Sequence, residues 1–462
     1  MSTAAIGRVT SRIVGARFAP GRDLRHTRAV VERRADSSSP ARLASFGSFL
    51  RGEDGKVYEG WLVVAAAASV VSLIAGFFFY GLGTFFTEFQ EEFAWSAAAT
   101  SIGFSLRSEV GGIAAPLVGW ALDRYPPRHL LRAGLLLSAL GCVAMSYISQ
   151  LWHFYAAMLM IAVGNTASGG QVGQYVTATW FRKRRAFAMS VMTFGGALGG
   201  TFAYFVALAI EQFGWRPTLR FMAAVLVVVA FTVGHRVRRR PADHHQPLDG
   251  AGDMQARASD HEIPIGAAVR SRSFVLVNLA TLFTDFVRVA FVVHVAAFIE
   301  SDLGASKGLA GAALLIFSIA SAPGRLVVGL LGDRFALRAV FALTMAPFIV
   351  GFLLLAVASR PWHAIVAVLV VSPGFGGSIP LRPAIYADYF GIATLGRVMG
   401  IGRLVSTTGG ALGAWVLGRL VDTNGGDYTT GWIVAAVLAA VTVPLALIAK
   451  PPTALQARHQ AV

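Results

Sequence analysis

The composition of this 462-residue chain separates it from soluble proteins, because 55% of its residues are hydrophobic, only 14% are charged and its mean hydropathy is +0.61. A soluble domain carries about 25% charged residues. A nucleic-acid binder could carry the net charge of +16, but many of the cations precede the first apolar run or lie at the ends of such runs, which argues against nucleic acid as a partner. The single cysteine, Cys142, excludes a disulfide within the chain and argues against a thiolate metal site, and we expect no metal and no cofactor.

Twelve apolar segments of about 20 residues or more follow one another along the chain, and this length is enough to cross a bilayer. Hydrocarbon offers no water to the backbone, so these segments should be helices. The sequence therefore predicts an all-α integral membrane protein with twelve transmembrane helices, at residues 61–86, 97–120, 130–149, 152–178, 186–210, 217–235, 274–299, 309–331, 338–358, 363–388, 396–421 and 431–449.

Three polar segments lie outside these spans. Residues 1–57 are rich in Arg and Ser, which indicates a disordered basic cytoplasmic tail, although a transit peptide has a similar composition. Residues 236–272 indicate a cytoplasmic linker, and 450–462 form a second tail. His244 and His245 in the linker lack a third metal ligand at zinc-finger spacing.

The charges of the short loops predict the orientation in the membrane. The loops after the second, fourth and eighth spans are rich in Arg, whereas those after the first and seventh carry mostly Glu and Asp. Because Lys and Arg concentrate in cytoplasmic loops, we expect the basic loops inside the cell, both termini cytoplasmic, and a place in the inner or plasma membrane.

Two short motifs occur twice, which indicates an internal duplication. The pattern Gly-x3-Asp-Arg-x3-Arg begins at Gly119 and again at Gly329, 210 residues later, each time after the second span of a half. The sequence GGALG begins at Gly195 and again at Gly409. We expect two pseudo-symmetric six-helix bundles, at 58–235 and 273–449.

With these motifs the sequence resembles the major facilitator superfamily of secondary transporters. The signature loop of that family maps onto Gly119, Asp123, Arg124 and Arg128, and onto Gly329, Asp333, Arg334 and Arg338. Within it the chain looks most like the branch of monocarboxylate transporters and oxalate/formate exchangers. The branch resemblance rests on Tyr58 to Trp61 and on residues 93–101, 180–190, 214–216 and 387–391, together with Asp422 and Tyr428.

The resemblance implies a twelve-helix fold with a substrate site between the bundles. It also implies that Gly119, Asp123, Arg124, Gly329, Asp333 and Arg334 form conformational latches that hold the cytoplasmic ends of the helices in one state. Two positions depart from the branch: Ser321 stands where a carboxylate is usual, and Ser406 stands where the oxalate exchanger has a lysine.

Ionisable residues at membrane depth are the strongest functional signal. Each costs about 2.5–3.5 kcal/mol if it faces lipid at the centre of the bilayer, so these residues must pair or face a polar cavity. They are Arg107, Glu109, Asp285, Arg288, Arg325 and Arg403. Asp285 and Arg288 are three residues apart and can pair on one helix face, whereas Arg107 and Glu109 point to different sides. Two cations remain in excess, which favours an anionic ligand.

The resemblance assigns the substrate carboxylate to Arg325, four residues before Gly329. Arg107, Arg288 and Arg403 are further substrate-binding candidates, as are Asn165, Gln171, Tyr80 and His294. Amides inside a membrane also simply join helices, so that alternative stays open. Glu109 is the first candidate for a proton-coupling group and Asp285 the second. Arg382 is either an anchor at the membrane surface or part of a gate.

The expected function is secondary active transport by alternating access of a small organic anion, monocarboxylate-like and proton-coupled. The expected partners are this substrate and membrane lipids, and we expect a monomer. Alternatives are an exporter of drug-like or other solutes, which the absence of Pro from 190–205 argues against, and a solute sensor that does not transport. We expect no enzyme activity, because no nucleophile and base stand at reactive spacing.

Overall fold

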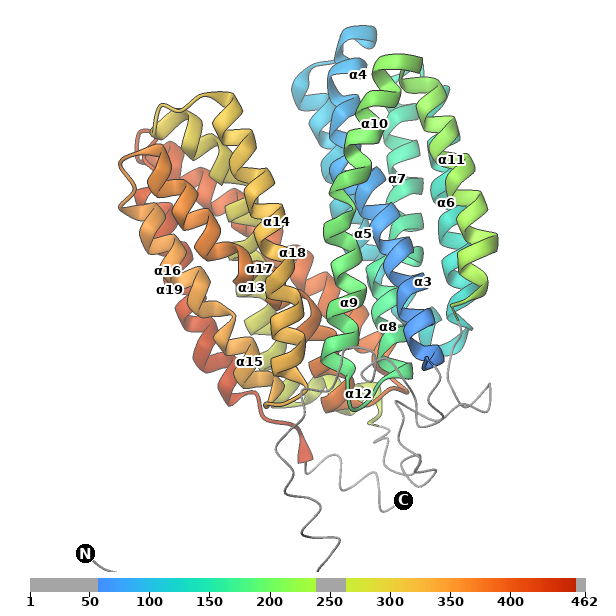
Figure 1. Ribbon diagram of the computed structural model, residues 1–462, viewed down its shortest axis with the longest axis vertical. Helices are drawn as coiled ribbons and strands as arrows, with labels where there is room; N and C mark the ends of the chain where they lie inside the picture. Colours follow the sequence, from blue (N-terminus) through green and yellow to red (C-terminus); the bar gives the residue numbers. More distant parts are fainter. Residues whose placement is uncertain (1–56, 238–262, 454–462) are drawn as a thin grey trace, which may run out of the picture. The chain divides into compact units, whose positions relative to one another are not determined.

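The computed structural model describes residues 57–237 and 263–453, and both ranges are helical almost throughout (Figure 1). Most of the two predicted tails and of the linker lies outside the described residues. The described part of the first half contains α3 (Glu59–Ile74), η3 (Ala75–Tyr80), η4 (Leu82–Thr84), α4 (Phe85–Phe93), α5 (Ala97–Arg124), α6 (Pro127–Ser146), α7 (Leu151–Ser168), α8 (Gly170–Trp180), α9 (Arg185–Leu198), α10 (Gly200–Phe213), α11 (Trp215–Thr232) and η5 (Val233–His235).

The second half has the same order of long helices. It contains α12 (Ile265–Arg270), α13 (Arg272–Ala297), η8 (Phe298–Asp302), α14 (Lys307–Gly332), α15 (Leu337–Leu343), α16 (Met345–Ala356), α17 (Pro361–Phe390), α18 (Leu395–Thr423) and α19 (Thr429–Ile448). In the described residues, ten helical segments are long and apolar enough to cross a membrane. The remaining two predicted spans, 97–120 and 152–178, correspond to α5 and to the pair α7–α8. The predicted twelve-span helical architecture is confirmed.

The duplication appears in the local structure of both halves. The Ser96 hydroxyl accepts a hydrogen bond at the start of α5, and the Ser306 hydroxyl does so at the start of α14, 210 residues later. A serine in this position satisfies a backbone N–H that the first turn leaves free. The ring pairs Trp152–His153 and Trp362–His363 repeat at the same spacing, with centroids 4.1 and 4.0 Å apart. These repeats show that α5 corresponds to α14, and α7–α8 to α17, at a spacing of 210 residues in the sequence.

The glycines of the repeated GGALG motif allow close helix packing. A Cβ atom added to Gly195 of α9 would lie 2.3 Å from a carbonyl oxygen of α3, and one added to Gly409 of α18 would lie 2.3 Å from a carbonyl oxygen of α13. Any larger residue would therefore push these helices apart. Small residues commonly let membrane helices approach in this way.

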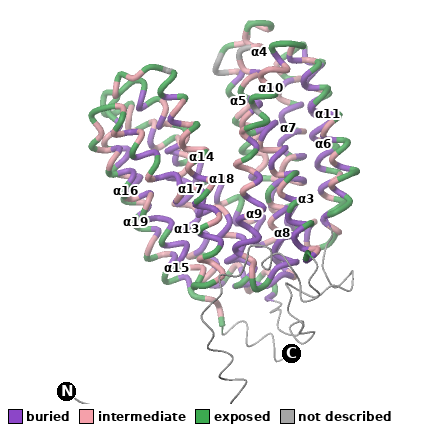
Figure 2. Tube along the Cα trace, in the orientation of Figure 1, coloured by how far each residue is buried: buried purple, intermediate pink, exposed green. Residues whose placement is uncertain are grey.

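Burial separates the inner and outer faces of the helices (Figure 2). Inside the second half, Trp432 stacks on Phe352 with ring centroids 6.0 Å apart, and both side chains are buried. Large apolar side chains such as Leu117 and Trp415 are instead exposed. A helix bundle in lipid needs no polar outer surface, so these exposed apolar faces fit a membrane environment.

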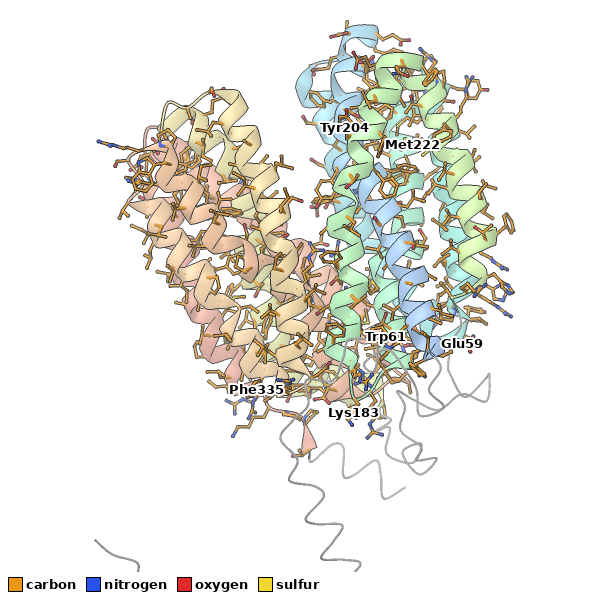
Figure 3. The ribbon with its side chains drawn as sticks, in the orientation of Figure 1. Glu59, Trp61, Lys183, Tyr204, Met222 and Phe335 are labelled. Carbon is orange, nitrogen blue, oxygen red and sulfur yellow. The ribbon has the colours of Figure 1, made fainter. Side chains whose placement is uncertain are left out.

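The two halves touch through α5 with α18 and through α9 with α14. The loops that follow α5 and α14 lie at one end of these helices, which we call the box end. Figure 3 labels Lys183 from the first half and Phe335 from the second, both near this end and both exposed.

Candidate functional site

The first repeated box bonds to a helix of the other half. The buried Asp123 carboxylate accepts hydrogen bonds from the backbone N–H groups of Gly396 (2.7 Å) and Arg397 (3.1 Å), and from Nε of Arg397 (2.8 Å). These are the second and third residues of α18, where backbone N–H groups have no partner inside the helix. A carboxylate at a helix N-terminus is also favoured by the helix dipole.

The second box repeats this arrangement in the opposite direction. Asp333 accepts hydrogen bonds from the backbone N–H groups of Ala186 (2.8 Å) and Phe187 (3.2 Å). These are again the second and third residues of a helix, here α9. Each half therefore caps a helix of the other half, and the bonds exist only while the halves are together at the box end.

The glycine that opens each box is required by contact between the halves. A Cβ atom on Gly119 would lie 2.1 Å from the carbonyl oxygen of Gly396, and one on Gly329 would lie 2.3 Å from the Ser190 hydroxyl. The first arginine of each box is exposed, unlike the aspartate. Arg124 is exposed, with its guanidinium 5.7 Å from the centre of the Trp120 ring, and Arg334 is exposed too.

Deep in the second half, Asp285 is the centre of a charged network. Its carboxylate accepts hydrogen bonds from Arg288 (2.6 Å), from Arg382 (2.8 Å) and from the Ser406 hydroxyl. The expected pair of Asp285 and Arg288 is present. Arg382 pairs with the buried Asp285, which does not fit an anchor at the membrane surface, whereas its expected role in a gate stays a prediction. Sequence reasoning missed this pair because α17 and α13 are far apart in the chain.

Arg325 crosses from one half to the other. Its side chain is 6% exposed, and Nη1 donates a hydrogen bond to the backbone carbonyl oxygen of Thr193 in α9. Its Nε is buried and has no hydrogen-bond partner among the described residues. Tyr80 is close enough to interact with it electrostatically. The guanidinium thus lies at the contact between the halves with a neutral oxygen as partner.

Arg107 and Arg403 come from opposite halves and lie close enough to repel each other. Within the described residues neither forms an ion pair, and the buried Nε of Arg107 has no hydrogen-bond partner. Arg403 is exposed although it lies mid-helix in α18. With Arg288, Arg325 and Arg382, five guanidinium groups interact in this region, and in the described part of the chain Asp285 is the one buried carboxylate among them.

Glu109 lies in the middle of α5 and is exposed. It makes no ion pair within the described part of the chain, and it points to a different side of α5 than Arg107, as the two-residue spacing predicts. His294 is held by the protein itself, with Nε2 2.9 Å from the carbonyl oxygen of Ala414.

The two amide candidates have one bond each to a neighbouring helix. The Ser138 hydroxyl donates to Oδ1 of Asn165 (3.1 Å), and Nε2 of Gln171 donates to the carbonyl oxygen of Ala115 (3.2 Å). The buried Nδ2 of Asn165 and Oε1 of Gln171 have no partner among the described residues. Each amide therefore joins helices and keeps one polar atom available.

The charges at membrane depth are not part of the repeat. At a spacing of 210 residues, each of them in α5, α14 and α17 corresponds to an uncharged residue: Arg107 to Phe317, Glu109 to Ile319, Arg325 to Ala115 and Arg382 to Val172. The opposite half builds the same helices without them. These charges are therefore not needed by the helix packing that the two halves share.

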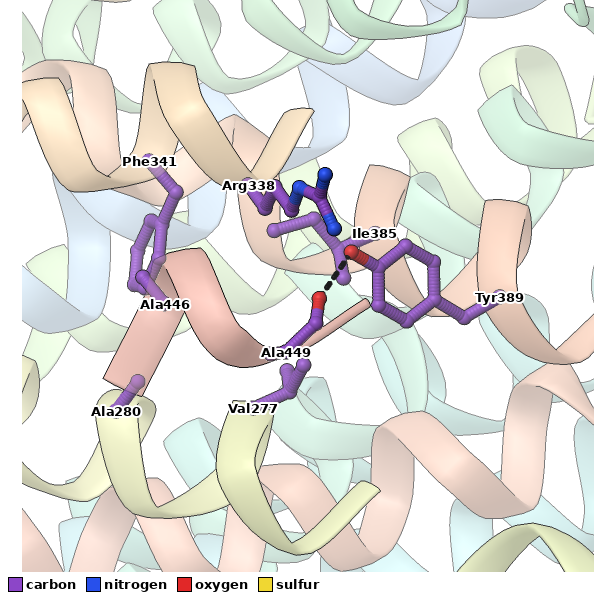
Figure 4. A pocket seen from close by; sticks show the side chains of 8 residues that line it. All are labelled: Val277, Ala280, Arg338, Phe341, Ile385, Tyr389, Ala446 and Ala449. Carbon is purple, nitrogen blue, oxygen red and sulfur yellow. Dashed lines mark hydrogen bonds between the residues drawn. The ribbon is translucent and has the colours of Figure 1, made fainter. Parts of the chain in front are cut away.

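A small crevice at the box end is a separate feature (Figure 4). It is lined mainly by apolar side chains, among them Val277, Phe341 and Ala446, with Arg338 and Tyr389 beside it. The Tyr389 hydroxyl donates a hydrogen bond to the carbonyl oxygen of Ala449 (2.5 Å). This crevice holds none of the guanidinium groups around Asp285, so it is not the candidate site.

Helices of this length, packed as two repeated halves around buried charges, define a multi-pass helical membrane protein. A family model described as "Major Facilitator Superfamily" matches residues 68–287 and again residues 277–461. The chain is 26% identical to "Monocarboxylate transporter 13" of Bos taurus, over 81% of this chain and 86% of that protein. It is 28% identical to "Probable nitrate/nitrite transporter NarK2" of Mycobacterium tuberculosis, over 86% of this chain and 96% of that protein.

Among solved structures, the proton:xylose symporter XylE matches with a TM-score of 0.69 and 14% identity, covering 87% of this chain and 99% of that chain. At that identity the match shows the fold alone. The chain belongs to the major facilitator superfamily and is related to its monocarboxylate-transporter branch. It is a membrane transporter of that superfamily.

Proposed function

We propose that this transporter carries a small organic anion, monocarboxylate-like, by alternating access. The observation that carries the proposal is an excess of positive charge: among the described residues, Arg288 and Arg382 share the Asp285 carboxylate, and Arg107, Arg325 and Arg403 have no ion pair. Buried charge without a counter-charge is costly, and an anionic substrate removes that cost when it binds. Two relatives are named for anions, a monocarboxylate and nitrate or nitrite, which supports the same class.

Arg325 is the principal anion ligand in this proposal. Its present partner is the backbone carbonyl of Thr193. A carboxylate is a stronger partner for a guanidinium than a neutral carbonyl, because the bond gains charge and both oxygens can accept. Arg107 and Arg403 add the positive field that draws the anion between the halves. Asp285 leaves little of Arg288 and Arg382 free, so these two act as secondary ligands.

The boxes act as the latch of the alternating-access cycle. While Asp123 and Asp333 cap helices of the opposite half, the box end stays closed and the substrate exchanges at the other end. We place the box end on the cytoplasmic side of the cell membrane, because the loops there are rich in Arg. Opening toward the cytoplasm then requires that both sets of bonds break.

Glu109 is the proposed proton-coupling group. Asp285 already has two guanidinium partners and a hydroxyl, which favour its ionised form. Glu109 has no ion pair in the described part and lies on the same helix as Arg107. Protonation of Glu109 removes a negative charge from the helix that carries Arg107 and so lowers the repulsion on the incoming anion, which couples uptake of the anion to uptake of a proton.

The proposal is tested in proteoliposomes with a panel of labelled monocarboxylates, dicarboxylates and nitrate, with and without a pH gradient. Arg325→Lys keeps the charge but loses the fork of donors, so transport should fall at least tenfold, and Arg325→Ala should abolish it. The matched control is Arg419→Lys, an exposed arginine in α18. Carboxylate transport by Arg325→Ala at the wild-type rate would show that the anion site is elsewhere.

The same experiment separates the alternatives. An exporter of drug-like solutes would move cationic dyes and ignore the anion panel. A sensor that does not transport would bind an anion without any flux. An exporter of cationic solutes would leave the guanidinium groups without a ligand. A sensor would leave them without a role in transport.

A further inference from the structure

An aromatic wall lies beside the guanidinium groups in the second half. The Arg288 guanidinium lies 4.2 Å from the centre of the Phe375 ring. Phe375 meets Phe317 edge-on, with ring centroids 4.7 Å apart, and Phe317 is 5.3 Å from Phe291. Phe317 and Phe375 are partly exposed, unlike Phe291, which is buried. Phe317 and Phe375 therefore lie at the edge of the core, where part of each ring can contact another molecule.

The internal repeat shows which positions these rings occupy. At a spacing of 210 residues, Phe317 corresponds to Arg107 and Phe375 to Asn165. The serine caps of α5 and α14 and the Trp–His pairs in the first turns of α7 and α17 show the same spacing in the structure. Arg107 and Asn165 both have a buried polar nitrogen without a hydrogen-bond partner in the described part. Equivalent positions in the two halves are thus polar and cationic in the first and aromatic in the second.

We propose that the substrate anion carries a planar aromatic ring, which binds against Phe317, Phe375 and the Arg288 guanidinium. The inference rests on the proposed anion transport and specifies the part of the substrate that is not ionised. A guanidinium stacked on one ring keeps its second face for another ring. Its Nη1 is fixed by Asp285, which holds the plane of the guanidinium in place.

The division of labour between the halves follows from this arrangement. The substrate carboxylate binds Arg325 and is attracted by the positive charges of Arg107 and Arg403. The substrate ring packs on the aromatic wall formed by Phe317 and Phe375. Aromatic pairs contribute about 0.5–1.5 kcal/mol beyond the area that they bury, which corresponds to a two- to tenfold preference for a ring. An aliphatic acid of equal size keeps the charge and the buried area but loses the free energy of the contact between aromatic rings.

The test compares two acids that differ only in aromaticity. The affinities of benzoate and cyclohexanecarboxylate for the purified protein in detergent are measured by titration calorimetry at pH 7.5, where both acids are ionised. The wild type should bind benzoate two- to tenfold more tightly. Phe375→Leu and Phe317→Leu each keep an apolar side chain, and each should remove most of that preference while the affinity for cyclohexanecarboxylate changes less than twofold. The control is Phe221→Leu, an exposed ring on α11.

Equal affinities for the two acids in the wild type would overturn the inference, and so would a benzoate preference that survives in both leucine variants. Arg325→Lys reports separately on the proposed function, because it should weaken both acids alike. If neither acid binds and no other anion of the panel does, the anion site itself is refuted. If both acids bind equally and both depend on Arg325, only the aromatic wall is refuted.

Discussion

The paired aspartates of the boxes make a prediction whose size follows from their hydrogen bonds. Asp123→Asn and Asp333→Asn each keep an oxygen acceptor but remove the negative charge. A hydrogen bond to a charged group contributes about 1.5–3 kcal/mol and is roughly twice as strong as its neutral counterpart. Each aspartate accepts bonds from two backbone N–H groups of the opposite half. Each substitution should therefore weaken the closed box end by about 1.5–3 kcal/mol, or about 10- to 150-fold in population.

The assay measures the distance between the halves at the box end. Spin labels are attached at Lys183→Cys and Phe335→Cys, which are exposed on opposite halves, and the native Cys142 is buried and should not react. Each asparagine variant should add a population with a longer distance. The double variant should add more, because the two aspartates cap different helices, α18 and α9. Transport should slow while substrate affinity changes little, since the boxes lie away from Arg325.

Distance distributions that stay unchanged in both asparagine variants would refute the latch. A large loss of substrate affinity with unchanged turnover would contradict it as well, because it would place the aspartates in the substrate site.

Three further predictions concern single features. Glu109→Gln should abolish accumulation driven by a pH gradient while exchange of substrate for substrate persists; continued accumulation would exclude Glu109 as the coupling group. Gly329→Ala should open the box end more than a substitution at an exposed glycine such as Gly308, because its Cβ meets Ser190; the same spin-label pair reports it. The hydrogen bond from Arg216 lowers the pKa of the exposed Glu92, so this pair adds stability above about pH 4 and loses it as the pH falls further. The difference in unfolding free energy between wild type and Glu92→Gln, obtained from their melting temperatures, should stay below about 1 kcal/mol. It should shrink as the pH is lowered toward 3.

Much of the fold was predictable because it depends on local properties of the chain. A run of about 20 apolar residues becomes a helix in lipid whatever lies beside it, and the duplication is visible as a fixed spacing between motifs. The pair of Asp285 and Arg288 was also predictable, since residues three apart share a helix face. These features need no knowledge of which helices are neighbours.

The rest depends on contacts between segments that are distant in the chain. Arg382 pairs with a residue 97 positions away, and Asp123 caps a helix 273 positions away. The sequence shows that such residues are charged and that they need partners. Only the packing of the helices decides which partner each one meets. The aromatic wall was missed for the same reason, because Phe317 and Phe375 look like ordinary core residues until Arg288 lies against one of them.

The two halves are alike at the boxes and different at the charged positions of the interior. Both boxes keep the glycine and the aspartate, and each aspartate caps a helix of the opposite half. The interior positions have diverged: Arg107 corresponds to Phe317, and Arg325 to Ala115. Two identical halves would offer an anion two equivalent sites and hold it in either direction. In the proposed site, Arg107 of one half and the Phe317 and Phe375 rings of the other would instead bind an asymmetric anion in one direction, and this difference within the repeat motivates the substrate proposal.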